Sequence, residues 1–248
     1  MSRSSMSLPI SSLTLASTPS PRDGTDARWR PGAGSGCHSE IFTASCEGGG
    51  VGAALALALD DWRSGTKPDE IAKDPRAVLW VQTREAARMG GRPYRPGLPA
   101  ELRHRLIHVV APRPEDALFS LEEGLRCREI AFVLGELAGN PRALDFTASR
   151  RLTLTAERYG VPLYLVRLDA RRDLSSARMR WEVTSAPSAL PQWNREAPGA
   201  PAWHCELFRS RRHAPGQWVL HDQGNALVAA HEEEPSMEPR PRAVLSGN

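Results

Sequence analysis

A cluster of glycines is the first feature of the sequence with a chemical meaning. Gly48, Gly49, Gly50 and Gly52 follow a short apolar stretch at residues 41–44 and precede a stretch rich in alanine and leucine. A strand, a glycine-rich turn and a helix form the layout of a phosphate-binding loop, in which backbone N–H groups and the helix N-terminus hold an anion. The cluster is therefore a candidate nucleotide loop.

The side chains that nucleotide chemistry needs are missing from this loop. If Gly52 is the last glycine of G-x-x-x-x-G-K-[ST], then Glu47 stands at the first glycine, and Ala53 and Ala54 replace the lysine and the hydroxyl residue. That lysine would reach the β and γ phosphates, the hydroxyl would hold Mg²⁺, and Glu47 would repel a phosphate. We expect no ATP hydrolysis and no cofactor, and we interpret the loop as a degenerate remnant of a nucleotide-binding ancestor.

Two acids occupy places where such a fold uses carboxylates. Glu136 follows the apolar run at residues 130–134, where a Mg²⁺-associated acid usually stands, and Glu85 follows the run at residues 77–81. Because there is no phosphate clamp to serve, we interpret Glu136 as a vestigial acid in a loop or at a helix cap. The same interpretation applies to Glu85.

Arginines form the most distinctive basic cluster. Arg209, Arg211 and Arg212 stand near a tryptophan, and arginine suits both phosphate contact and aromatic stacking. The cluster is compatible with an acidic protein partner, with single-stranded nucleic acid, and with a solvated hairpin. Arg150 and Arg151 form a second pair on a predicted helix, where a solvent-facing position is the alternative. These five arginines are the candidate partner-binding residues.

Metal and nucleophile chemistry find little support in the sequence. His104 and His108 straddle a predicted helix-to-strand boundary, and His204 and Cys205 would point to opposite sides of a strand. No G-x-S-x-G elbow is present. The cysteines form no C-x-x-C pair and do not resemble a disulfide framework. We expect no metal site and a reducing, cytoplasmic compartment.

Strand and helix patterns alternate through the middle of the chain. Strands are predicted at residues 41–44, 77–81, 106–110, 130–134 and 161–168, and helices at residues 53–62, from Pro114, and from Asp145 to Gly160. This alternation predicts an α/β fold with a mostly parallel sheet and helices on both faces. Three more strands, at residues 179–184, 203–209 and 217–221, have no long helix between them. We expect them to add to one edge of the sheet in antiparallel orientation.

The two ends of the chain differ from this middle part. Residues 1–38 are rich in Ser, Thr, Pro and Gly, and residues 223–248 contain an acidic run and then prolines. Such segments bury too little apolar area to offset the entropy of ordering them. We predict two disordered tails around a single domain at residues 39–222, with partner-binding peptides as the alternative for each tail.

Composition excludes some classes of protein. The chain has 248 residues and a formal net charge of +3, which allows nucleic-acid binding without demanding it. No apolar run approaches the roughly 18 residues of a membrane span, so we expect no membrane association. The N-terminal residues lack the continuous apolar segment of a secretory signal, and a serine-rich organellar transit peptide is the alternative.

The order of these elements resembles the ATPase core of RecA. More closely, the chain resembles the ImuA family, the RecA-like accessory proteins of bacterial inducible mutagenesis. The resemblance covers residues 38–222, and its most specific part is the run Leu144-Asp145-Phe146-Thr147-Ala148-Ser149-Arg150-Arg151-Leu152. The resemblance also rests on Val78 to Gln82, Asp116 to Leu118, Gly135 to Leu137, Arg180-Trp181 with Ala186 to Ser188, and Glu206 to Arg209 with Pro215-Gly216.

The resemblance implies a role in the SOS response to DNA damage. It implies action by protein–protein interaction beside an ImuB-like protein and an error-prone DNA polymerase in translesion synthesis. RecA and a weak contact with DNA are further candidate partners. In RecA, two lysines of a strand reach the neighbouring subunit's nucleotide, and Arg209 and Arg211 stand at the corresponding positions here. The alternatives are a divergent ATPase, completed by arginines from a neighbouring subunit, and a division inhibitor similar to SulA.

Overall fold

The structure, a computed structural model, describes residues 28–34, 36–64, 68–188, 191, 194 and 196–230. At the centre of this described part is a nine-stranded sheet in the order β3-β2-β4-β5-β1-β6-β7-β8-β9. The first six strands of this order, from β3 to β6, pair in parallel with their neighbours. Strands β7, β8 and β9 each pair in antiparallel orientation with the strand before them. The strands are β1 (His38–Thr43), β2 (Ala77–Thr83), β3 (Leu106–Ala111), β4 (Ile130–Ala138), β5 (Leu163–Leu168), β6 (Met179–Ser185), β7 (Ala202–Ser210), β8 (Gly216–Asp222) and β9 (Leu227–Ala230). The predicted α/β class is confirmed.

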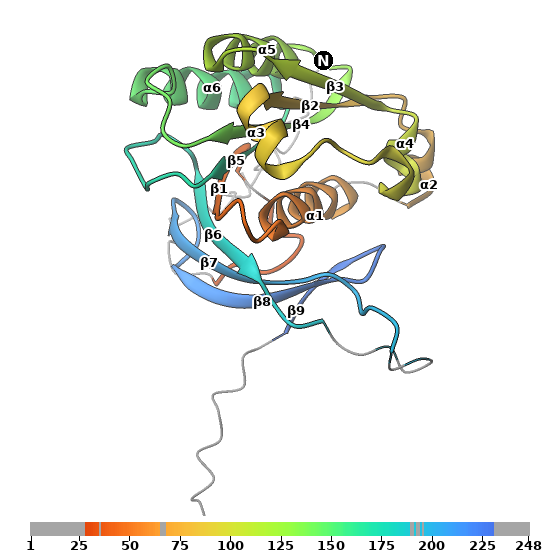
Figure 1. The fold of residues 1–248 in the computed structure, drawn as a ribbon. Coiled ribbons are helices and arrows are strands. Elements are labelled where there is room, and N and C mark those ends of the chain that lie inside the picture. Colours follow the sequence, from red (N-terminus) through yellow and green to blue (C-terminus); the bar gives the residue numbers. More distant parts are fainter. Residues whose placement is uncertain are drawn as a thin grey trace, which may run out of the picture.

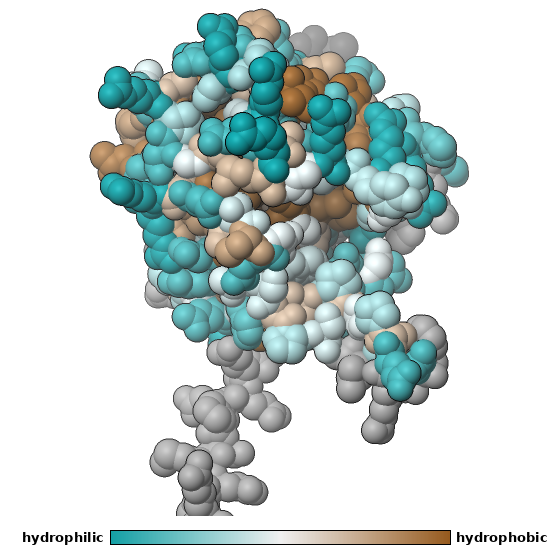
Figure 2. Space-filling view, viewed as in Figure 1, coloured by the Kyte–Doolittle hydropathy of each residue, from teal (hydrophilic) through white to brown (hydrophobic). Residues whose placement is uncertain are grey.

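Helices cover both faces of the sheet, as predicted (Figure 1). They are α1 (Gly49–Ser64), α2 (Pro68–Lys73), α3 (Arg84–Gly90), α4 (Ala100–Arg103), α5 (Pro114–Arg126) and α6 (Phe146–Tyr159), with a 3₁₀ turn at Arg95–Gly97. Between the sheet and α1 lies one apolar core, which contains Trp80 and Trp181. Between the sheet and the pair α5 and α6 lies the other, which contains Leu121 and Leu165. Figure 2 shows apolar side chains gathered over α1 in the middle of one face, below mostly hydrophilic ones.

Both ends of α6 follow from its sequence. The Asp145 side chain accepts a hydrogen bond from the Ala148 N–H at 2.7 Å, which satisfies one of the unpaired donors of the first turn. Gly160 ends the helix at φ +69°, and its N–H donates to the Ala156 carbonyl. The predicted helix from Asp145 to Gly160 is confirmed with both caps.

The direction of β6 differs from the prediction. β6 pairs in parallel with β1, and only β7, β8 and β9 are antiparallel. We call the edge where the parallel strands end the carboxyl edge, and the edge where they begin the amino edge. Residues 169–178 return from the carboxyl edge to the amino edge without a helix, so β6 starts beside β1, where the Arg178 N–H donates to the His38 carbonyl. Because this return is irregular, the sequence pattern suggested a hairpin instead.

Both predicted domain boundaries need correction. At the start, Trp29 is only 3% exposed and lies in the core beside Trp181 and Trp218, so the segment predicted to be disordered to residue 38 already contributes packing. At the end, β9 pairs with β8, so the sheet continues beyond residue 222. The remaining parts of the two predicted tails, residues 1–27 and 231–248, lie outside the described residues.

Candidate functional site

The glycine cluster lies at the carboxyl edge, but most of it is in a helix rather than a loop. β1 ends at Thr43 and α1 begins at Gly49, so residues 44–48 form the whole connection. The Glu47 N–H donates to the Ala44 carbonyl, which closes a tight turn in this connection. Gly52, placed by the sequence at the end of a phosphate loop, is within α1. The alignment with G-x-x-x-x-G-K-[ST] therefore places its last glycine, and Ala53 and Ala54 after it, in the first turns of α1.

Packing accounts for Gly49, Gly50 and Gly52. A Cβ atom at Gly50 would lie 2.3 Å from the Thr43 side chain, so α1 approaches the end of β1 too closely for any larger residue. At Gly52 a Cβ atom would lie 3.2 Å from the Trp203 ring, and at Gly49 it would lie 2.7 Å from the Ser185 hydroxyl. The small residues let the start of α1 pack against β1, β6 and β7.

The polar groups of the connection are bound by other parts of the chain. The Glu47 carboxylate accepts a hydrogen bond from the Ser185 N–H at 2.8 Å, at the end of β6. The Ser45 N–H and hydroxyl donate to the Asp169 carboxylate at 2.9 and 2.6 Å, just after β5. These bonds lower the pKa of Asp169. Two carboxylates thus hold the turn that would have to receive a phosphate, and both would repel it.

Glu136 is in β4, where the sequence predicted a loop or a helix cap. Its side chain is 2% exposed, and its Oε1 accepts hydrogen bonds from Trp80 Nε1 and from Gln82 Nε2 at 3.0 Å. Its Oε2 has no hydrogen-bond partner among the described residues. Burial raises the pKa of Glu136 to about 6, although the two hydrogen bonds oppose this rise. The interpretation as a cap acid is therefore wrong.

Glu136 belongs to a chain of polar groups that includes His108. The Gln82 side chain bonds to Glu136, to the Gly91 carbonyl at 2.8 Å and to His108 Nε2 at 2.8 Å. Burial lowers the pKa of His108, with Arg92 and Arg95 acting in the same direction. Glu85 is separate from this chain: it is exposed in the first turn of α3 and lines a recess of about 410 Å³ at the carboxyl edge.

The candidate arginines of the hairpin lie at the other edge of the sheet. β7 runs antiparallel to β6 and ends with Ser210 opposite Met179, the first residue of β6. Arg211 and Arg212 follow in the turn, where they line a recess of about 370 Å³, and Arg209 is exposed at the end of β7. This amino edge is opposite the glycine cluster, because Thr43 ends a strand that β6 parallels. Within one chain the hairpin arginines and the glycine cluster do not form one site.

The second arginine pair is separate from the first. Arg150 and Arg151 are both exposed on α6, and Arg151 Nε forms an ion pair with the Glu122 carboxylate of α5 at 2.6 Å. Arg151 thereby links α5 to α6, whereas Arg150 has no ion pair within the described ranges. The five predicted partner-binding arginines thus fall into two groups.

A buried ionic cluster escaped the sequence analysis. Glu40 of β1 is fully buried and accepts hydrogen bonds from Arg180 Nε at 2.8 Å and from the Ser175 hydroxyl at 2.9 Å, with Arg167 Nη1 at 3.6 Å. The two arginines also lie over the Phe42 ring, 5.0 and 5.5 Å from its centre. The signal was present: Arg167, Glu40 and Arg180 are charged residues within or directly beside three predicted strand segments. Their alignment across β5, β1 and β6 required the strand order.

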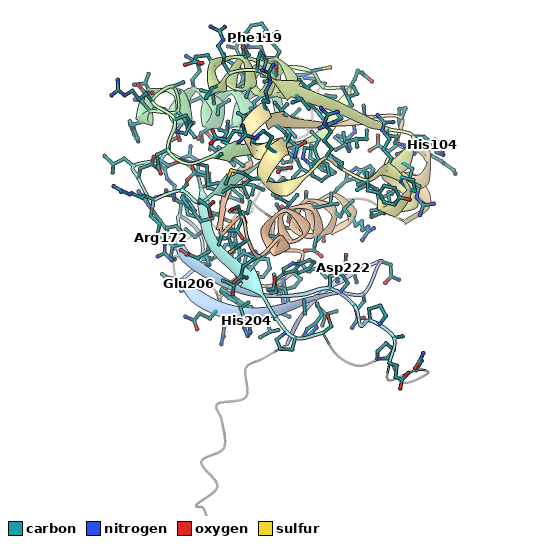
Figure 3. The ribbon with its side chains drawn as sticks, in the orientation of Figure 1. His104, Phe119, Arg172, His204, Glu206 and Asp222 are labelled. Atoms are coloured by element: carbon teal, nitrogen blue, oxygen red, sulfur yellow. The ribbon has the colours of Figure 1, made fainter. Side chains whose placement is uncertain are left out.

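The remaining histidines and cysteines stay apart. His104 is exposed next to α4, and His204 is exposed on β7 (Figure 3). Cys205, the next residue of β7, is buried. Within the residues that the structure describes, no three His, Cys, Asp or Glu side chains are grouped to hold a metal ion. Arg172 instead bridges Glu182 and Glu206 on the face of β6 and β7 and lies over the Phe208 ring.

Comparison with known proteins gives no match: no protein-family model matches the chain, and no curated protein sequence matches it. No helix in the described part combines the length and the apolar character needed to cross a membrane.

Proposed function

We propose that the protein is a non-catalytic, RecA-like accessory protein that acts in the cytoplasm in error-prone translesion DNA synthesis. The structure at the carboxyl edge is the observation that supports a role without catalysis. There, the connection between β1 and α1 is short, the glycines at the start of α1 are used for packing, and Glu47 and Asp169 hold the connection in place. A fold that lacks the side chains for nucleotide chemistry still offers a rigid surface on which partners can bind.

The RecA-like part of the proposal rests on the order of elements. Alternating parallel strands and helices are followed by antiparallel strands at one end of the sheet, which is the arrangement expected from the resemblance. The most specific run of the resemblance, residues 144–152, forms the start of α6. Its Asp145 caps the helix and its Leu152 is buried, while Phe146 and Arg150 remain exposed. The exposed members of the run are candidates for partner contact.

The expected partners are an ImuB-like protein and an error-prone DNA polymerase. In the triple variant R209A/R211A/R212A, capture of these partners from DNA-damaged cells should fall about tenfold or more, because three exposed charge contacts contribute roughly 0.5 kcal/mol each. Stability should change by less than about 0.5 kcal/mol per substitution. The frequency of damage-induced mutation should fall with partner capture. The pair E70Q/E196Q, exposed carboxylates elsewhere, is the control that changes charge without touching the arginines.

Three outcomes would contradict this proposal. Damage-induced mutation that does not depend on the protein would remove the role in translesion synthesis. Filamentation of cells on overexpression, without an effect on mutation, would favour the division inhibitor. Unchanged partner capture by the triple variant would move the search for the interaction surface to Asp145–Arg151.

A second prediction concerns nucleotide. The protein should bind Mg²⁺-ATP weakly or not at all and should show no turnover above background, because Ala53 and Ala54 stand where a lysine and a hydroxyl would act. Equilibrium binding of a fluorescent ATP analogue and phosphate release measure the two properties. Turnover that a bulky residue at Gly52 abolishes would instead support the divergent ATPase.

A further inference from the structure

The recess at the amino edge is lined by more positive than negative charge. Three arginines and one glutamate line it, namely Arg178, Arg211, Arg212 and Glu157. The Glu157 carboxylate forms an ion pair with Arg178 Nε, so one cation of the recess is already neutralised. Arg211 and Arg212 are exposed, and neither forms an ion pair with a carboxylate of the described residues. The recess therefore keeps cationic groups for an anionic ligand.

Four separate parts of the chain form this recess. They are the residues that lead into β1 (Gly34, Gly36 and Cys37), the start of β6 (Arg178 and Met179), the end of β7 with the turn after it (residues 210–213), and Glu157 in the last turn of α6. These parts meet because β1 and β6 both begin at the amino edge and β7 ends there. The recess is thus a feature of the folded domain rather than of a single loop.

Local hydrogen bonds fix the turn that carries the two arginines. The Ser210 hydroxyl accepts hydrogen bonds from the N–H groups of Arg212 and His213, both at 3.1 Å. The Arg211 N–H donates to the Arg178 carbonyl at 3.2 Å, which joins the turn to the start of β6. A turn held in this way presents its charges with little entropy left to lose on binding.

Glu157 shows how the recess acts on a carboxylate. The hydrogen bond from Arg178 lowers the pKa of Glu157 most, and the charges of Arg211 and Arg212 lower it further. The ionised form of a carboxylate is therefore favoured here. A second carboxylate that enters the recess would experience the same attraction from Arg211 and Arg212.

The size and the charges of the recess favour an acidic peptide over a nucleic acid. Its volume of about 370 Å³ is enough for a few side chains. A nucleic-acid backbone is bound by cations placed along successive phosphates, whereas the two unpaired arginines are adjacent in one turn. Glu157 would also repel a chain of closely spaced phosphates more strongly than a single carboxylate.

We propose that the amino-edge recess binds an acidic segment of a partner protein, whose carboxylates pair with Arg211 and Arg212. This inference rests on the proposed function, because it specifies what the arginines of the hairpin bind and where. It also places Cys37 beside the bound segment. The Cys37 thiol is partly accessible in the recess, whereas the exposed Cys46 lies at the carboxyl edge and serves as an internal reference.

Protection of Cys37 by an acidic peptide tests the proposal. We would titrate the full chain with acetylated hexaglutamate and measure iodoacetamide labelling of Cys37 and Cys46 by peptide mass spectrometry. At a peptide concentration of about twice the Kd, labelling of Cys37 relative to Cys46 should fall about threefold, because about two thirds of the recesses are then occupied. Acetylated hexaglutamine should give no protection, and about 0.5 M salt should remove most of the protection by hexaglutamate.

Two variants test whether the arginines of the turn hold the peptide. In R211Q/R212Q the Kd of hexaglutamate should rise about fivefold, because two exposed charge contacts are lost. R84Q/R150Q removes two exposed arginines on other elements and should leave the Kd unchanged. Labelling with and without peptide is compared within each variant, since Arg212 itself lowers the pKa of Cys37 against the effect of burial.

Three outcomes would overturn the proposal. The first is equal labelling of Cys37 with and without hexaglutamate. The second is stronger protection by a single-stranded oligothymidylate with the same number of charges, which would assign the recess to nucleic acid. The third is loss of partner capture in R209A/R211A/R212A without any protection of Cys37 by the peptide, which would leave the proposed function standing and move the contact outside the recess.

Discussion

Replacing Leu134 by aspartate should abolish cooperative folding. Leu134 is 1% exposed in β4, and it lies between Trp80 of β2 and Tyr164 of β5 in the sheet. An aspartate there would place an unpaired carboxylate in the core between the sheet and α1. The loss of apolar burial and the cost of a buried unpaired polar group together amount to about 5 kcal/mol or more, comparable with the whole stability of a typical domain.

Urea denaturation followed by circular dichroism measures this effect. L154D is the matched control, because Leu154 is 49% exposed on α6 and its replacement should change stability by less than about 0.5 kcal/mol. If L134D melts like the parent, β4 is not the central strand of a folded sheet.

Elements with a strong local pattern were predictable from the sequence. The run at residues 130–134 lies in β4, which is buried along nearly its whole length, as expected for a parallel strand covered on both faces. Asp145 and Gly160 correctly predicted where α6 begins and ends. An N-cap acid and a glycine in the left-handed conformation each form hydrogen bonds with residues only three or four positions away. Such local signals do not depend on which strands become neighbours.

Properties that depend on strand neighbours were not predictable. The same glycines that suggested a phosphate loop allow α1 to approach Thr43 and Trp203 closely, and these two residues belong to different strands. Glu136 was expected in a loop or at a helix cap, yet it is buried in β4 and accepts hydrogen bonds from Trp80 and Gln82 of the adjacent β2. From sequence alone, a charged residue in a strand is predicted to be exposed, because its hydrogen-bond partner on the next strand is not known.

The two edges of the sheet therefore have opposite character. At the carboxyl edge, the Glu47 and Asp169 carboxylates accept hydrogen bonds from the chain at the connection between β1 and α1. At the amino edge, Arg211 and Arg212 are exposed in a fixed turn.

Trp29 is the residue whose removal should most clearly show where the folded domain begins. Its ring lies edge-on to Trp181 at 4.8 Å and to Trp218 at 5.4 Å, between β6 and β8. The next residues continue this packing, because the Gly32 N–H donates to the Asp60 carboxylate of α1 at 2.6 Å. A segment rich in glycine and proline, predicted to be disordered, thus closes the core between the sheet and α1.

The variant W29A should lose about 3–5 kcal/mol of stability, since a buried tryptophan replaced by alanine leaves a cavity and removes two aromatic contacts. Chemical denaturation measures the change, and a red shift of the intrinsic tryptophan fluorescence, to which Trp181 and Trp218 contribute, reports whether the ring environment becomes solvated. W29F should recover part of the loss, because a ring in the same place refills much of the cavity. R30A is the control, as Arg30 is the exposed neighbour of Trp29 and its loss should cost less than about 0.5 kcal/mol. A W29A variant as stable as R30A would contradict this and favour a domain that begins at residue 39, where the sequence had placed its boundary.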